Sequence, residues 1–216
     1  FPTRRSSDLI VRNVYVHSTF TNREVIDELC GKNNIRVTAA DKLISKLSDK
    51  ENVFVIGVFD TYSEELNPDS SHVMLVNPSN MGNAGTIIRT CIAFGIKDLA
   101  IISPGIDVFN PKCVRASMGA LFRIRHHYYA SFEEYERSVT RRDCFSFMLT
   151  GKKQQTVDEC EKPDVFTLIF GNEATGLPAQ YEDYSKSIII PQSEEVDSLN
   201  LTIAVGVGVY NFVHKL

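Results

Sequence analysis

The chain has 216 residues, of which 43% are hydrophobic and 23% are charged, and its formal net charge is -4. This composition is typical of a globular protein with enough residues for one large core and a small additional domain. No apolar run reaches the roughly 20 residues of a membrane span, and neither a signal peptide nor a paired-cysteine motif is recognisable, so we expect a cytoplasmic protein without membrane contact, disulfides or structural zinc.

The first nine residues, "FPTRRSSDL", read as the translation of a sequencing-adapter oligonucleotide. We therefore set residues 1–9 aside as an artefact, as is done for tags and fusion scars. On this interpretation the natural protein begins further upstream and the chain is truncated.

Residues 10–59 alternate strand-like and helix-like patterns, which predicts a small α/β domain. The expected strands are residues 11–18, 35–39 and 52–59, and the expected helices are residues 22–33 and 41–47. Residues 60–71, "DTYSEELNPDSS", are polar and lack an apolar period, which predicts a linker.

Residues 72–216 predict an α/β domain with a mostly parallel sheet and helices on both faces, because apolar β runs alternate with helical segments. The expected strands are residues 72–77, 98–103, 123–129, 144–150, 165–171 and 186–191. The expected helices are residues 85–94, 111–122, 131–139 and 198–213. Ligand-binding loops are expected at the carboxyl ends of the strands.

Three of the loops that follow these strands carry unusual residues: "NPSNMGNAGTIIRT", "GNEATGLP" and "IPQSEEVDSLNLTIAVGVG". Each one alone is also typical of a turn or a helix start. Asparagine tolerates left-handed backbone, so we expect Asn77 and Asn80 to shape the first turn. Asp197 or Ser198 is expected to cap the last helix. None of the loops matches the glycine-rich dinucleotide or P-loop patterns.

Taken in order, the three loops resemble the signature motifs of the SpoU/TrmH family of RNA ribose 2′-O-methyltransferases, in the SPOUT superfamily, over about residues 72–213. Asn83 and Arg89 stand at the first motif's positions, Glu173 at the second's, and Ser198 and Asn200 at the third's. The resemblance implies a trefoil knot in the C-terminal part of the sheet, and a homodimer that places first-motif residues beside the partner's site. It also implies that residues 10–59 are the remnant of a small RNA substrate-binding domain.

The implied reaction moves a methyl group from S-adenosyl-L-methionine to a ribose 2′-hydroxyl in RNA, without a metal. Ribosomal RNA is expected rather than transfer RNA, because of the additional domain. Family accounts make Arg89 a general base, but a guanidinium stays protonated up to a pKa above about 12, which favours a clamp on phosphate or on a developing alkoxide. Asn83 is expected to orient Arg89 or the substrate hydroxyl, and Ser198 to bind a phosphate oxygen. Glu173 and Asn200 are expected to tie the three loops together.

The expected cofactor-binding residues lie in the second and third loops. The glycines would allow close backbone approach, and the two apolar residues would enclose the adenine. The set comprises Gly171, Asn172, Gly176, Ile190 and Leu199.

Charge is unevenly distributed along the chain. Residues 110–153 carry nine Lys and Arg against four Asp and Glu, whereas residues 154–216 carry three against ten. The basic segment is the candidate RNA footprint, with an ordinary solvated face as the alternative. The expected RNA-binding residues are Arg115, Arg123, Arg125, Arg141 and Arg142.

Two other functions fit parts of the pattern. A non-catalytic RNA-binding member of the same family would keep the fold, and a Rossmann-like nucleotide-dependent enzyme would show the same α/β alternation. Cofactor binding separates the last of these from the methyltransferase, since S-adenosylhomocysteine would stabilise a methyltransferase and NAD would not.

Overall fold

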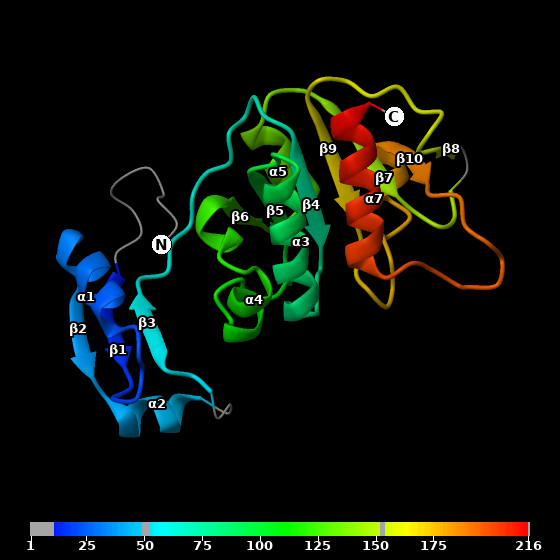
Figure 1. The fold of residues 1–216 in the computed structure, drawn as a ribbon. Helices are drawn as coiled ribbons and strands as arrows, with labels where there is room; N and C mark the ends of the chain where they lie inside the picture. Colours follow the sequence, from blue (N-terminus) through cyan, green and yellow to red (C-terminus); the bar gives the residue numbers. More distant parts are fainter. Residues whose placement is uncertain (1–10, 49–51, 152–153, 216) are drawn as a thin grey trace. The chain divides into compact units, whose positions relative to one another are not determined.

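The structure is a computed structural model that describes residues 11–48, 52–151 and 154–215. The chain divides into two compact units, residues 1–62 and 63–216 (Figure 1). The adapter-like residues 1–9 lie outside the described residues.

The first unit is a small α/β fold. Its elements are β1 (Val11–Val16), α1 (Arg23–Lys32), β2 (Arg36–Ala39), α2 (Asp41–Leu47) and β3 (Val55–Phe59). The strand order is β2-β1-β3, and β1 pairs parallel with β2 and antiparallel with β3. Val14, Val16 and Cys30 form its small buried core. The alternating α/β pattern of the sequence therefore predicted this unit correctly.

The second unit contains a seven-stranded sheet in the order β6-β5-β4-β9-β7-β10-β8. Every pairing in this sheet is parallel. The strands are β4 (His72–Val76), β5 (Asp98–Ile102), β6 (Arg125–Tyr129), β7 (Asp143–Phe147), β8 (Gln155–Thr156), β9 (Phe166–Phe170) and β10 (Lys186–Ile189). The parallel sheet predicted from the alternation of apolar runs is confirmed.

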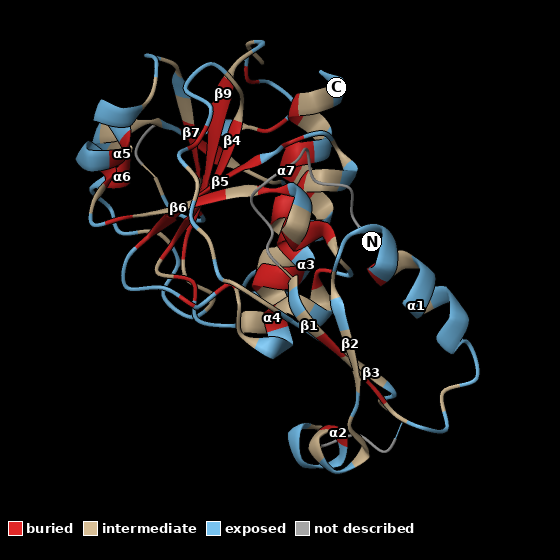
Figure 2. Ribbon diagram, turned by 90° about the vertical axis from the view of Figure 1, so that its left-hand side faces the viewer, coloured by how far each residue is buried: buried red, intermediate tan, exposed pale blue. Residues whose placement is uncertain are grey.

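Helices cover both faces of this sheet, as predicted (Figure 2). One face carries α3 (Met81–Ala93), α4 (Pro111–Ala116) and α7 (Leu201–His214), and the other carries α5 (Phe132–Ser138) and α6 (Tyr181–Tyr184). In β4, Val73 and Leu75 join the first core and Met74 and Val76 join the second, because successive side chains of a strand point to opposite faces. All five residues of β4, β5 and β9 are consequently buried.

Three of the predicted helices differ from the structure by more than one residue. The helix α3 begins at Met81 rather than at residue 85, and α7 begins at Leu201 rather than at residue 198. The predicted helix 111–122 is interrupted: α4 ends at Ala116, and the 3₁₀ helix η1 (Ala120–Arg123) follows. The interruption arises because Met118 and Gly119 both adopt left-handed backbone, which an α-helix does not accommodate.

Residues 63–71, which were expected to be linker, pack on the second unit. Leu66 is buried in the core beneath α5. The Asn67 backbone N–H donates to the buried Asp98 carboxylate at 2.9 Å, and Arg142 donates to the carbonyls of Pro68 and Ser70. Most of the expected linker is therefore part of the larger unit.

The sheet order places β9 between β4 and β7 and β10 between β7 and β8. Strand order alone does not specify how the chain threads. The trefoil knot stays a prediction of the family resemblance.

Candidate active site

A cavity of about 370 Å³ opens at the carboxyl ends of β7, β9 and β10 and at the start of α7. In open parallel sheets, ligands bind at this edge, where the strand order changes direction. All five residues of the expected cofactor set line it: Gly171, Asn172, Gly176, Ile190 and Leu199. Apolar residues make up more than half of the described lining, and Glu173 is the one charged residue in it.

The loop after β9 forms a tight wall of this cavity. Asn172 and Gly176 exchange two backbone hydrogen bonds, at 3.2 and 2.9 Å. The Asn172 side chain accepts from the N–H groups of Ala174 and Thr175 and donates to the Asn77 carbonyl at 2.7 Å. A Cβ at Gly171 would lie 2.2 Å from the Gly176 carbonyl carbon, so only glycine fits there. The second loop is thus rigid and joined to the first.

Glu173 fastens the same two loops through its carboxylate. Its Oε2 accepts from the Ser79 N–H at 3.1 Å and from the Ser79 hydroxyl at 2.8 Å. Its Oε1 accepts from the Asn80 N–H and from Asn83 Nδ2, both at 3.2 Å. Burial alone would raise the pKa of Glu173, but these donors lower it below its ordinary value, so the group is a carboxylate at neutral pH. This tie between the first two loops was expected from the sequence.

The first loop ends in a well-capped helix. Asn77 has a left-handed backbone, with φ +49°, and Asn80 accepts from the N–H groups of Gly82 and Asn83 at 2.9 and 3.0 Å. Both asparagines therefore shape the turn, as expected. Asn83 lies within the first turn of α3, not in the loop before it, and its amide binds Glu173 rather than Arg89.

Arg89 lies in the middle of α3 and is exposed. It is not among the described residues that line the cavity. Thr86 precedes Arg89 by three residues and neighbours it on the helix surface, whereas Asn83 precedes it by six and lies about 120° away around the helix axis. The expected contact between Arg89 and Asn83 is absent from the described hydrogen bonds, in which Asn83 faces Glu173.

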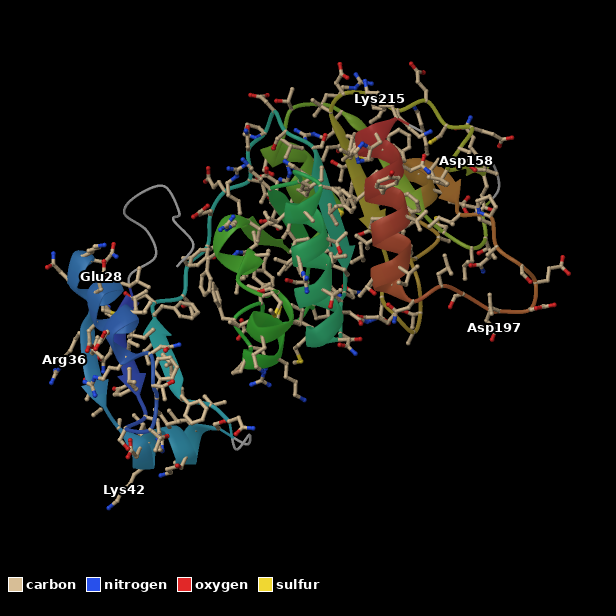
Figure 3. All side chains as sticks on the ribbon, viewed as in Figure 1. Glu28, Arg36, Lys42, Asp158, Asp197 and Lys215 are labelled. Atoms are coloured by element: carbon tan, nitrogen blue, oxygen red, sulfur yellow. The ribbon has the colours of Figure 1, made fainter. Side chains whose placement is uncertain are left out.

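The third loop contributes Ser198 and Leu199 to the cavity lining. The cap of α7, however, is Asn200, whose side chain accepts from the Thr202 N–H at 2.9 Å and the Thr202 hydroxyl at 2.7 Å. Asp197 points away from the unit on the loop between β10 and α7 (Figure 3). The prediction that Asp197 or Ser198 caps the helix is therefore wrong, and Asn200 holds the start of α7 rather than tying the three loops together.

Two of the five arginines expected to bind RNA have partners within the protein. Arg125 donates from Nε and from one terminal nitrogen to the two oxygens of Asp98, at 2.7 and 2.6 Å. Burial would raise the pKa of Asp98, but Arg125, Ser70 and Asn67 lower it below its ordinary value. Arg142 binds the carbonyls of residues 68, 70 and 140. Arg115, Arg123 and Arg141 are exposed.

Several cavity residues were not predicted from the sequence. Phe147, Met148, Leu149 and Thr150 line it from the end of β7, and Gln192 lines it from the third loop. Ser79 was missed as a partner of Glu173. The only sequence signal for the β7 residues was their place after a strand of the same sheet, and nothing in the residue pattern favours this strand end over the others.

Neither a metal centre nor a membrane span is found in the part of the chain that the structure describes. No group of three or more His, Cys, Asp or Glu residues there is arranged to hold a metal ion. None of its helices is long and apolar enough to cross a bilayer.

The chain is similar to several curated proteins, two of which are described here. An uncharacterized tRNA/rRNA methyltransferase of Synechocystis is 31% identical over 60% of this chain, which spans only 47% of that protein's length. The 23S rRNA (uridine(2479)-2′-O)-methyltransferase of Streptomyces viridochromogenes is 28% identical over 83% of this chain and 67% of its own.

Solved structures show the same fold. The AdoMet-bound rRNA methyltransferase of Sinorhizobium meliloti has a TM-score of 0.85 at 24% identity, covering 96% of this chain and 81% of its own. A protein studied for 2-OH methylation of C/U34 on tRNA has a TM-score of 0.61 at 30% identity, covering 69% of this chain and 92% of its own. Residues 70–210, which hold all three loops and the cavity, match the SpoU rRNA Methylase family, and the chain belongs to that family.

Proposed function

We propose that this protein transfers a methyl group from S-adenosyl-L-methionine to a ribose 2′-hydroxyl in RNA. The observation that carries the proposal is the cavity itself, which brings all five expected cofactor residues together beside the Glu173 carboxylate. Family membership supports the same reaction and weighs against a Rossmann-like nucleotide-dependent enzyme.

The residues of the cavity fit the proposed cofactor. A volume of about 370 Å³ and apolar walls suit a nucleoside, whose polar edges backbone groups can bind. Among the described lining residues there is no Lys or Arg, and the Glu173 carboxylate favours a cationic ligand. The cofactor supplies a methyl group on a positively charged sulfur, which is a good leaving group. Ile190 and Leu199 would enclose the adenine, as the sequence predicts.

The protein's own part in the reaction is positioning and charge. The chain would hold the 2′-hydroxyl in line with the methyl group that the bound cofactor would supply, and the hydroxyl proton would leave to solvent. A fixed guanidinium such as that of Arg89 stabilises a developing alkoxide or holds the adjacent phosphate. Ser198 lines the cavity beside the helix α7 and is available to a phosphate oxygen.

We further propose ribosomal RNA as the substrate class and the first unit as the remnant of a substrate-binding domain. The Streptomyces 23S rRNA enzyme matches 83% of this chain, which is more than the second unit alone contains. The protein studied with tRNA matches 69%, about the extent of the second unit. Of these two proteins, the one whose match extends into the first unit is the one named for ribosomal RNA.

A homodimer is proposed through the outer face of α7. Ile203 and Tyr210 are 54% and 46% exposed there, which is unusual for large apolar side chains on a helix of otherwise high hydrophobicity. Between them, Gly206 has no atom within 4 Å of a Cβ built at its position, so another helix can approach closely. Arg89, on the adjacent helix α3, would then serve the partner's cavity.

The test is a methylation assay with labelled S-adenosylmethionine, unmodified ribosomal and transfer RNA, and mass spectrometry of the digested nucleosides. We expect a 2′-O-methyl nucleoside from the unmutated protein and none from Arg89→Ala, which should fold and bind S-adenosylhomocysteine normally. Cofactor binding without product would indicate a non-catalytic RNA-binding member. Absence of both binding and product would refute the proposal.

A further inference from the structure

Met118 stands out on the surface of the second unit. Of the large hydrophobic residues that the structure describes, none is more exposed, at 74%. It belongs to none of the hydrophobic clusters of the described residues. Its side chain therefore contributes little to the stability of the fold.

The backbone at this position adds a cost. Met118 has φ +49° and Gly119 has φ +84°, both in the left-handed region that favours glycine. The turn is held by the Met118 N–H, which donates to the Arg115 carbonyl at 3.2 Å. A glycine at position 118 would form the same turn without strain. Strained residues that the fold does not require are concentrated at functional sites.

The segment of the sequence around Met118 contains positively charged residues and no negatively charged ones. Between residues 108 and 131 the sequence contains no Asp or Glu. Lys112 and Arg115 are exposed and three residues apart on α4, so they share a face of that helix. Neither forms an ion pair with a carboxylate within the described ranges of the chain.

This basic surface lies at the same edge of the sheet as the cavity. The helix α4 follows β5 directly, and the carboxyl ends of parallel strands share one edge. Figure 1 shows α4 beside the beginning of α3, at the end of the sheet toward which β4 points. A polymer bound at the cavity would extend over this surface if it continued past α3.

We propose that Met118, Lys112 and Arg115 form an RNA contact in which the methionine packs against an unstacked base and the two cations bind phosphates. The inference rests on the proposed function and assigns this surface to its substrate. Apolar side chains, methionine included, insert between bases of nucleic acids, and exposed cations bind their backbone. A second copy of the chain fits less well, because a two-fold contact centred here would set like charges against each other.

The test measures affinity for a short single-stranded RNA of mixed sequence, and for the same RNA annealed to its complement, across a salt series. With the full chain, Met118→Gly should weaken single-strand binding about five-fold and leave the salt dependence unchanged. Arg115→Ala should weaken binding to both RNAs and lower the salt slope by about one. Met118→Leu keeps an apolar side chain and should bind as the parent does. Affinity for S-adenosylhomocysteine should be the same in all four proteins.

Equal single-strand affinity of Met118→Gly and the parent would overturn the inference. So would a Met118→Gly chain that loses its dimeric state in sedimentation while each subunit still binds RNA normally, because Met118 would then contact a second copy. Either result leaves the proposed function intact if the parent methylates RNA. A parent that binds neither RNA also overturns the inference, and the methylation assay on ribosomal and transfer RNA then decides the proposed function separately.

Discussion

The Glu173 carboxylate is the residue on which the geometry of the first two loops depends. Four donors from Ser79, Asn80 and Asn83 converge on its two oxygens, so each oxygen must accept. If an amide nitrogen replaces one of these oxygens, its N–H groups face other donors and the hydrogen bonds to that oxygen are lost. Glutamine at position 173 has the size of glutamate without its charge, so it tests directly whether the carboxylate holds the two loops together.

We expect Glu173→Gln to lower the free energy of unfolding by about 1–3 kcal/mol, the usual cost of leaving partly buried donors unsatisfied. It should also weaken S-adenosylhomocysteine binding about ten-fold, because the carboxylate holds in place the loop that forms one wall of the cavity. Denaturant titration and calorimetry measure the two effects. Glu24→Gln, on the exposed first turn of α1, is the control and should change neither. Unchanged cofactor affinity in Glu173→Gln would refute the role.

A second residue, His72, makes stability depend on pH. Its Nε2 lies 2.8 Å from the Asn67 carbonyl, which can only accept, so Nε2 carries the proton. Its Nδ1 then accepts from the Tyr135 hydroxyl at 2.8 Å. Burial lowers the pKa of His72 from 6.5 to about 4. The neutral ring therefore fits its partners and the charged ring does not.

The unfolded chain protonates His72 below pH 6.5, whereas the folded chain resists protonation until about pH 4. The neutral His72 ring therefore makes its full contribution to the free energy of unfolding above pH 6.5. This contribution, up to about 3 kcal/mol, is lost as the pH falls toward 4. The check is the free energy of unfolding of the parent and of His72→Gln across this range. Their difference should shrink with falling pH, and a constant difference would contradict the assignment.

At the scale of an element, α3 shows how packing overrides local preference. Residues 77–84, with their asparagines and Gly82, were predicted to be loop, since glycine lowers helix stability by about 1 kcal/mol. The helix nevertheless begins at Met81, because Asn80 caps it and Gly85 lets α4 approach. A Cβ at Gly85 would lie 2.4 Å from the Cys113 carbonyl oxygen and 2.9 Å from the Ser117 nitrogen.

Gly85→Ala should therefore destabilise the second unit by about 1–3 kcal/mol, although alanine is the better helix former. Gly31→Ala on α1 is the matched control: no atom lies within 4 Å of its Cβ position, so only the propensity gain remains there. Thermal unfolding of the two variants should shift in opposite directions. A stabilised Gly85→Ala chain would show that the contact between α3 and α4 is looser than described.

Local sequence patterns predicted part of the structure, and contacts between residues far apart in the sequence account for what those patterns missed. Periodic apolar runs predicted the parallel sheet and its two helical layers, and the three loops predicted the lining residues from Gly171 to Leu199. The positive charges of Arg125 and Arg142 suggested RNA, but their partners, Asp98 and the carbonyls of residues 68 and 70, are far away in sequence. Such pairs are visible only after folding.

At the scale of the whole molecule, the question is whether Arg89 acts at the cavity of its own subunit or at that of a partner in the proposed dimer. Arg89 is exposed on α3 and does not line the cavity of its own subunit, and α3 packs against α7, which carries the apolar face proposed for dimerisation. In a two-fold dimer the same surface of each subunit meets its equivalent, so both arginines would be placed alike. If each arginine acts on the partner's cavity, the active site is complete only in the dimer.

An experiment that combines two inactive variants in one dimer distinguishes action of Arg89 within its own subunit from action across the interface. Arg89→Ala keeps its cavity, and Gly171→Val keeps its arginine but fills the cavity wall, where a Cβ already meets backbone at 2.2 Å. Subunits mixed in equal amounts by co-expression form mixed dimers with one complete site if Arg89 acts across the interface, which should restore about a quarter of the parent's activity. If Arg89 acts within its own subunit, every site in the mixture lacks one component and no activity returns. Sedimentation must show that Gly171→Val still dimerises, because a subunit that does not assemble cannot supply its arginine.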